Sequence, residues 1–237
     1  MKTFFWIVLL LVVGTMIIVF SGSKDSELDR YAQPVSTSED GQSDDTAETK
    51  TVVSDGTYVV LADDSTVFWS GKKPLVDGYI NTGSMDLKSG SIEIDNDVIT
   101  GEFTIDMETL SVTDTPTKPG KEDTLEGHLK GAGWFNVEEY PEAKFVITEA
   151  VARPDFESTF MYDVKGDLTL KGVTNELSFP AKIFNDQDGL TYASADLEFD
   201  RTLWGLTAGS GSFFDNLADN VIDDMVALSF TLVSEQE

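Results

Sequence analysis

The sequence contains no cysteine and a single histidine, His128. Without cysteine the chain forms no disulfide, holds no metal through thiolates and has no thiol nucleophile. Catalytic zinc sites normally take several histidine ligands, and no Gly-x-Ser-x-Gly motif is present to supply an activated serine. Carboxylates are too numerous for an acid–base pair to be singled out. We therefore expect no catalytic residue, no metal site and no cofactor.

Basic residues are scarce in this chain. It has 16 lysines and arginines against 43 aspartates and glutamates, which gives a formal net charge of -27. A surface this acidic repels phosphate backbones, so nucleic acid is excluded as a partner. The charge favours solubility, and the alternative is that it forms a docking face for a basic partner.

Only one long hydrophobic run is present, at residues 4–20 (FFWIVLLLVVGTMIIVF). As a helix it reaches about 26 Å, a little short of a hydrocarbon core of about 30 Å. It exceeds the apolar part of a secretory signal peptide, and no good cleavage site follows it. We expect residues 1–23 to form an uncleaved signal-anchor transmembrane helix. The alternative is a cleaved signal peptide.

The charges around this run predict its orientation. Lys2 precedes it, and the segment that follows is net acidic, so the N-terminus is expected to face the cytoplasm. The rest of the chain then lies outside the cytoplasm, anchored to the cytoplasmic membrane. After signal cleavage it would instead be secreted or periplasmic.

Residues 24–56 are rich in Ser, Thr, Asp, Glu and Gln and poor in large apolar side chains. Such a segment cannot bury enough apolar surface to offset the conformational entropy lost on folding. We expect an acidic, disordered linker, with a single folded domain over residues 57–237.

From residue 57 the pattern changes to short alternating runs separated by turn residues. Alternation of apolar and polar side chains predicts antiparallel strands in a barrel or sandwich. Helical spacing is found only at residues 123–130, with Asp123 or Thr124 as the cap, and at residues 215–224. The apolar positions of the clearest alternating runs are Phe103, Ile105, Met107, Tyr162, Val164, Leu168, Leu170, Leu177, Phe179, Ala181, Ile183, Ala193, Ala195, Leu197, Phe199, Val226, Leu228, Phe230 and Leu232.

Three motifs follow one another in this part of the chain. They are residues 125–129 (LEGHL) leading into residues 134–141 (WFNVEEYP), residues 166–174 (GDLTLKGVT), and residues 200–205 (DRTLWG). Their order and spacing resemble the YceI-like family, and the resemblance covers roughly residues 57–233. It implies an all-β, lipocalin-like antiparallel barrel of about eight strands with one or two short helices, which holds polyisoprenoid-type lipids.

In a small barrel, alternate side chains point inward and either fill the interior or line a slender ligand site. Arg201 contacts the lipid's polar head, or it has a structural role and stacks on Trp204 or pairs with a neighbouring acid. His128 similarly bonds to backbone in its segment or faces the mouth of the cavity. The apolar candidates for contact with lipid are Trp69, Phe103, Ile105, Phe145, Ile147, Val164, Leu168, Phe179, Phe199 and Phe230.

Three functions compete at this stage. The resemblance favours a membrane-tethered extracytoplasmic carrier for an isoprenoid or similar long-chain lipid. The alternative is a ligand-free barrel that acts as an acidic interaction module, which a completely filled interior would indicate. An enzyme acting on an apolar substrate is the third, and no nucleophile–base pair supports it.

We predict that residues 1–23 remain on the mature protein. The protein should then fractionate with membranes and resist extraction by high salt and by alkaline buffer, because the apolar run has no charge to release it. Recovery of a soluble chain that begins near Gly22 would identify a cleaved signal peptide instead.

Overall fold

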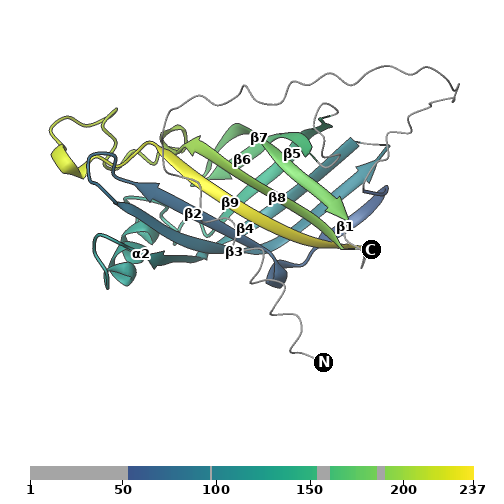
Figure 1. Ribbon diagram of the computed structural model, residues 1–237, viewed down its shortest axis with the longest axis horizontal. Coiled ribbons are helices and arrows are strands. Elements are labelled where there is room, and N and C mark those ends of the chain that lie inside the picture. The colour runs from purple at the N-terminus through teal and green to yellow at the C-terminus, as the bar shows by residue number, and fades with distance from the viewer. Residues whose placement is uncertain (1–52, 97, 154–160, 186–189) are drawn as a thin grey trace, which may run out of the picture. The chain divides into compact units, whose positions relative to one another are not determined.

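The computed structural model describes residues 53–96, 98–153, 161–185 and 190–237, and Figure 1 shows its ribbon. β-strands make up most of the regular structure in this part. The elements are β1 (Gly56–Val60), η1 (Ala62–Asp64), β2 (Thr66–Lys72), β3 (Ile80–Asp95), β4 (Val98–Asp114), α2 (Glu122–Lys130), β5 (Glu142–Ala152), β6 (Met161–Leu170), β7 (Val173–Asn185), β8 (Thr191–Asp200), η2 (Arg201–Trp204), η3 (Ala218–Asn220) and β9 (Met225–Gln236), where η marks a short 3-10 helix.

The strands close into an antiparallel barrel with eight positions. The order around it is β3-β2-β9-β8-β7-β6-β5-β4, and the pairing of β3 with β4 joins the two ends of the sheet. Closure gives every strand two neighbours, although β7 pairs with β8 only between residues 182–185 and 191–194. The predicted antiparallel barrel of about eight strands is confirmed.

Two strands share one position in this barrel. Tyr58 of β1 lies opposite Ile92 of β3 and Gln236 of β9, whereas β2 pairs with the earlier part of β3 and of β9. At the break between them, Ser65 Oγ donates to the Leu61 carbonyl at 2.8 Å and accepts from the Val233 amide at 3.0 Å. A serine hydroxyl thus satisfies backbone groups that a continuous strand would have paired.

Alternate residues of the strands point into the barrel, as the sequence pattern predicts. On β6, Tyr162, Val164, Leu168 and Leu170 are buried, and the charged neighbour Asp163 is exposed. The expected inward residues of β7, β8 and β9 are also buried or partly buried, namely Leu177, Phe179, Ala181, Ile183, Ala193, Ala195, Leu197, Phe199, Val226, Leu228, Phe230 and Leu232.

Two inward positions carry glycine because an aromatic ring lies over them. Gly83 pairs with Trp69 across β3 and β2, and a Cβ at Gly83 would approach the Trp69 ring to 2.6 Å. A Cβ at Gly166 would meet the Phe145 ring and approach the Val146 carbonyl oxygen to 2.5 Å. The rings of these two cavity candidates therefore lie flat against the strand wall, since no side chain stands beneath them.

The helix predicted at residues 123–130 is confirmed as α2, but its cap differs. The capping residue is Lys121, whose side chain makes no capping hydrogen bond. The Glu122 carboxylate instead accepts from Thr115 Oγ1 at 2.6 Å and from the Gly120 amide at 3.2 Å. The preceding turn, and not a polar cap, thus holds the start of the helix.

The helix predicted at residues 215–224 is wrong. In this segment the chain forms only the short turn η3. Asn216 and Ala218 have φ values of 62° and 48°, in the left-handed region that interrupts a right-handed helix. The spacing of Leu217, Val221 and Ile222 was therefore misleading.

The predicted anchor at residues 1–23, and the predicted linker up to residue 52, lie outside the described residues. The folded part begins ahead of the expected residue 57, because Val53 is buried and the Tyr58 hydroxyl donates to the Ser54 carbonyl at 2.7 Å. Among the residues that are described, no helix has the length and apolar character needed to span a bilayer.

We predict that Gly166→Ala lowers the free energy of unfolding by about 2–3 kcal/mol, because the new methyl group collides with a backbone carbonyl and a packed ring. The melting temperature should fall by about 4–10 °C in a thermal unfolding scan. Gly127→Ala on α2 is the matched control, since a Cβ there meets nothing within 4 Å. It should be neutral or stabilising. Equal melting temperatures for the two variants would contradict this packing.

Candidate functional site

Two adjoining cavities lie inside the described part of the barrel, and the larger of these two lies beside α2. This helix-side cavity has a volume of about 140 Å³. Leu125 and Leu129 of α2 cover it, and the β2–β3 turn and the segment after β8 contribute to its wall. The polar side chains in its lining belong to Lys72, Lys73, Tyr79, Asn81, Arg201 and Asp223.

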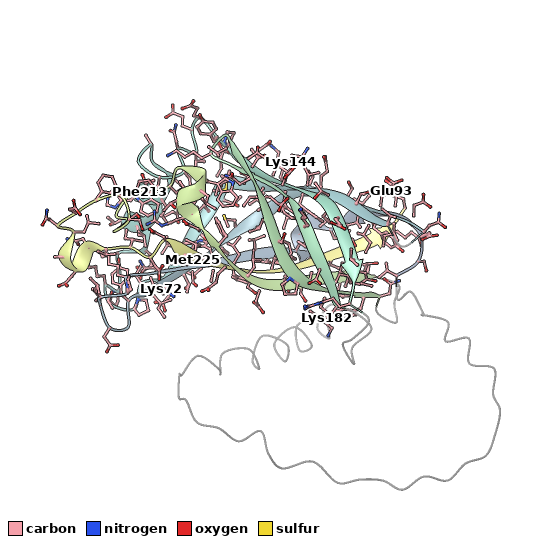
Figure 2. All side chains as sticks on the ribbon, turned by 90° about the horizontal axis from the view of Figure 1, so that it is seen from above. Lys72, Glu93, Lys144, Lys182, Phe213 and Met225 are labelled. Atoms are coloured by element: carbon pink, nitrogen blue, oxygen red, sulfur yellow. The ribbon has the colours of Figure 1, made fainter. Side chains whose placement is uncertain are left out.

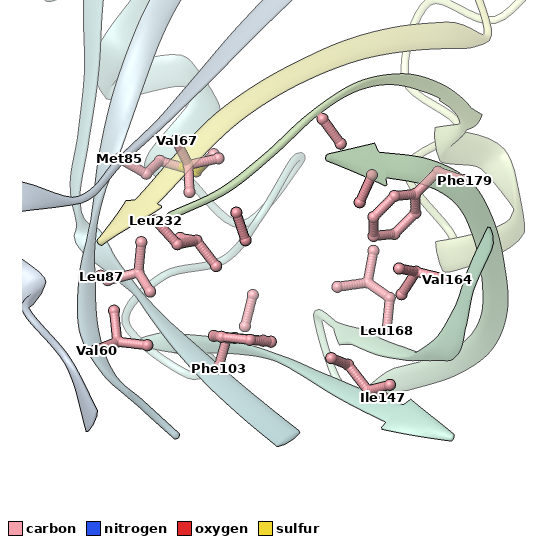
Figure 3. Close-up of a cluster of buried hydrophobic side chains, with 14 of the residues drawn as sticks. Val60, Val67, Met85, Leu87, Phe103, Ile147, Val164, Leu168, Phe179 and Leu232 are labelled. Carbon is pink, nitrogen blue, oxygen red and sulfur yellow. The ribbon is translucent and has the colours of Figure 1, made fainter. Parts of the chain in front are cut away.

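The second, central cavity has a volume of about 100 Å³ and only hydrophobic residues in its lining. Figure 3 shows Phe103, Ile147, Val164 and Phe179 projecting into the interior from different strands. The Phe179 ring centre lies 5.5 Å from that of Phe145 and 5.8 Å from that of Phe230. Aromatic edges and faces thus form much of this wall.

The two cavities adjoin. Ile105, Leu168 and Leu228 line both of them, so a chain running from one cavity into the other passes these three side chains. An apolar cavity of about 150 Å³ can hold a benzene-sized group. Each cavity therefore has room for roughly one such group while the three residues keep their positions.

Every lipid-contact candidate taken from the sequence lies on one of these cavities. Their contact with a ligand stays a prediction, but the structure brings them together. Trp69, Phe199 and Arg201 line the helix-side cavity; Phe103, Phe145, Ile147, Val164, Phe179 and Phe230 line the central one; and Ile105 and Leu168 line both.

Sequence reasoning missed part of the helix-side lining. Trp134 and Phe135 follow α2, and their WFNV segment has no alternating pattern to mark them as inward. Tyr79 and Asn81 follow Gly78, a residue type that is typical of turns, so the sequence does not mark them as part of a cavity wall. The cavity wall from the β2–β3 turn could be found only from the fold.

Arg201 is buried and bonded mainly to backbone. Its Nε donates to the Asp223 carbonyl at 2.9 Å, its Nη1 donates to the Leu206 carbonyl, and its Nη2 donates to the Ile222 carbonyl at 3.3 Å. Nη2 also lies 3.6 Å from Asp224 Oδ1. The side chain is only 2% exposed, so these contacts tie two segments together inside the fold.

The aromatic partner of Arg201 is Trp134. The guanidinium carbon lies 5.1 Å from the centre of the Trp134 ring, so the expected stacking on Trp204 is wrong. Trp204 turns inward instead, donating its Nε1–H to the Leu168 carbonyl at 2.9 Å and meeting the Phe199 ring edge-on at 5.1 Å. The expected pairing of Arg201 with a neighbouring acid is confirmed by Asp224.

Arg201 and Asp224 each shift the pKa of the other. Burial lowers the pKa of Arg201, while Asp224 raises it, with burial dominant. Burial raises the pKa of Asp224, but hydrogen bonds from Ser210 and Ser212 and the charge of Arg201 outweigh it, so this pKa lies below its usual value. The depressed pKa means that ionised Asp224 contributes stability above the ordinary Asp range. That contribution is lost as the pH falls through the depressed value.

His128 lies on α2 with an exposed side chain. It lines neither cavity, so the structure does not bring it together with the other candidates. Its carbonyl accepts from the Gly131 amide at 3.2 Å, which ends the helix.

A sequence profile of the YceI-like domain matches residues 58–234, which include every strand pair around both cavities. The chain belongs to this family. The matched residues include the closed sheet, α2 between β4 and β5, and the turn that carries Arg201 after β8. The resemblance in the three sequence motifs is therefore confirmed.

Two relatives illustrate the distance in sequence. A UPF0312 protein of Photorhabdus laumondii is 33% identical over 95 residues, which are 36% of this chain and 45% of the relative. Protein YceI of Escherichia coli O157:H7 is 32% identical over 80 residues, which are 34% of this chain and 38% of that protein. The chain thus matches less than half the length of each relative.

Solved structures share the fold. BcnA of Burkholderia cenocepacia is 21% identical, with a TM-score of 0.56 over 73% of this chain and 98% of that one. A polyisoprenoid binding domain from Saccharophagus degradans is 20% identical, with a TM-score of 0.55 over 76% of this chain and 98% of that one. At these identities the likeness concerns the fold alone.

We predict that Arg201→Met lowers the free energy of unfolding by about 2–4 kcal/mol, because three carbonyls and Asp224 lose their donor. Arg201→Lys should lose most of the same stability, since an ammonium cannot reach all these acceptors. Urea unfolding measures both.

Arg153→Lys is the control for this prediction. Arg153 forms an ion pair with Asp163 at 3.1 Å in which the side chains are 35% and 62% exposed, so the change should cost less than about 0.5 kcal/mol. Wild-type stability in Arg201→Lys would show that charge alone, without the forked geometry, suffices at position 201.

Proposed function

We propose that this protein binds a long apolar chain of isoprenoid or similar type in the two adjoining cavities. The observation that carries the proposal is that both cavities have a mainly apolar lining and lie within a YceI-like barrel. The polyisoprenoid binding domain from Saccharophagus degradans has the same fold and supports the choice of ligand class. An interior with two unfilled apolar spaces favours a carrier over a ligand-free interaction module.

Burial of hydrocarbon provides the driving force. Each CH₂ group moved from water into such a cavity contributes about 0.8 kcal/mol, so ten such groups supply roughly 8 kcal/mol before the costs of binding. That value corresponds to an affinity on the order of micromolar. A chain of this length occupies both cavities and passes Ile105, Leu168 and Leu228, which line both.

The proposal includes a location. The apolar run at residues 4–20 would anchor the protein in the cytoplasmic membrane, with the barrel outside the cytoplasm. A carrier tethered in this way remains close to the bilayer that contains its ligand. No catalytic step is assigned to the barrel.

We predict that long-chain isoprenoid lipid copurifies with the full-length protein and is detected by mass spectrometry of a solvent extract. Phe179→Lys should lose this lipid, because it places a charge at a buried position of the central cavity. Ala181→Leu is the milder variant. Ala181 is 2% exposed and lines the same cavity, so added methyl groups occupy ligand space without introducing charge.

Ala181→Leu should keep the melting temperature within about 3 °C of wild type, because it fills existing space. It should bind long chains at least tenfold more weakly. Lys182→Leu, one residue along on the outer face of the same strand, is the control. Absence of lipid in the native protein, together with no uptake of added polyprenyl compounds, would contradict the carrier function.

A further inference from the structure

Asn81 is an unusual residue for the wall of an apolar cavity. It is 7% exposed and lines the helix-side cavity. Within the described part of the chain, its carboxamide makes no hydrogen bond to another protein group. Its polar atoms remain accessible, because the one side-chain nitrogen or oxygen that is buried without a partner among the described residues is Asp224 Oδ1. An accessible, unpaired amide in the wall of an apolar cavity offers donors and an acceptor, and therefore points to a ligand.

The strand geometry directs Asn81 inward. It shares the inner face of β3 with Gly83 and with Met85, which also lines the helix-side cavity. Directly opposite on β2 is Gly71, and a Cβ built there meets nothing within 4 Å. Opposite residues of an antiparallel pair point to the same face, so there is open space beside the Asn81 amide.

We propose that Asn81 forms a hydrogen-bonding subsite for a neutral polar group, a hydroxyl or a carbonyl, at one end of the bound apolar chain. This inference rests on the proposed carrier function and adds which amphiphiles the cavity selects. A carboxamide offers both donors and an acceptor, so it pairs with either group. The rest of the ligand lies among the apolar side chains that continue to Ile105 and Leu168.

The charges near Asn81 favour a neutral head over an anionic one, because each cation in the cavity lining has a partner. Lys72 lies 3.4 Å from Asp223 Oδ2, and Lys73 donates to Asn220 Oδ1 at 3.3 Å while covering the Tyr79 ring. The donors of Arg201 are directed at backbone carbonyls and at Asp224. A buried phosphate or carboxylate would have to break these pairs and approach Asp223.

Figure 2 shows where this cavity wall lies along the barrel. Lys72 and Met225 are at the same end as Phe213, and Glu93 is toward the other end. Asn81 pairs with Gly71, next to Lys72 on β2. The subsite is thus at the end of the barrel that carries α2, and the central cavity continues away from it for the apolar tail.

The experiment compares three probes with full-length protein in an amphipathic polymer: farnesol, the hydrocarbon farnesene and farnesyl phosphate. Binding is followed by tryptophan fluorescence, since Trp69 and Trp134 line the helix-side cavity. Wild type should bind farnesol about tenfold more tightly than farnesene, because one good hydrogen bond changes an affinity by about that factor. Asn81→Leu should abolish this preference while leaving the affinity for farnesene unchanged.

A second readout separates recognition from structural support. Because Asn81 has no hydrogen bond to the protein to lose, Asn81→Leu should keep the melting temperature of the ligand-free protein within about 3 °C of wild type. Asn81→Thr retains a hydrogen-bonding group and should recover part of the preference for farnesol. Gly71→Val keeps Asn81 but fills the space beside it, so it should also reduce that preference.

Several results would overturn the subsite. One is equal binding of farnesol and farnesene by wild type, and another is an unchanged preference in Asn81→Leu. A third is tightest binding of farnesyl phosphate with no effect of Asn81→Leu, which would indicate an anionic head group. A fall in melting temperature with loss of all binding would assign Asn81 a structural role. Failure of wild type to bind any probe would instead refute the carrier function.

Discussion

The interior of this barrel depends on aromatic rings that lie over residues without side chains. Trp69 covers Gly83 and Phe145 covers Gly166, so large rings lie along the wall without filling the centre. With alanine or a larger residue at these positions, the rings would be forced toward the axis, where the two cavities lie. The same contacts thus provide apolar burial for folding and leave the two cavities unfilled.

The end of the barrel beside α2 is organised by one buried cation. Arg201 joins the turn after β8 to the carbonyls of Leu206, Ile222 and Asp223, and its guanidinium lies against Trp134 from the segment after α2. An irregular segment is stable here because its carbonyls have a donor. The segment after α2 and the segment after β8 therefore form neighbouring parts of the wall of the helix-side cavity.

The sequence predicts the inner faces of β6 to β9 well, because polar or small residues alternate with apolar ones along most of these strands. On β4 the alternation shifts at Thr109, whose hydroxyl donates to the Asp106 carbonyl at 2.7 Å and accepts from the Asp86 amide at 2.8 Å. Such a bulge depends on a neighbouring strand, which local pattern does not include. The contact between Arg201 and Trp134 and the unpaired amide of Asn81 likewise depend on residues distant in the sequence. The sequence therefore suggested the nearby Trp204 as the partner of Arg201 and gave no signal for Asn81.

The position that β1 and β2 share also determines where the chain enters and leaves the barrel. β1 enters between the final residues of β3 and β9, and the Glu237 amide donates to the Thr57 carbonyl at 3.0 Å, so both chain ends of the barrel meet there. Figure 1 shows this place at the end of the barrel remote from α2. A domain joined directly at Gly56 or at Glu237 would therefore be attached at the end of the barrel opposite α2 and the helix-side cavity.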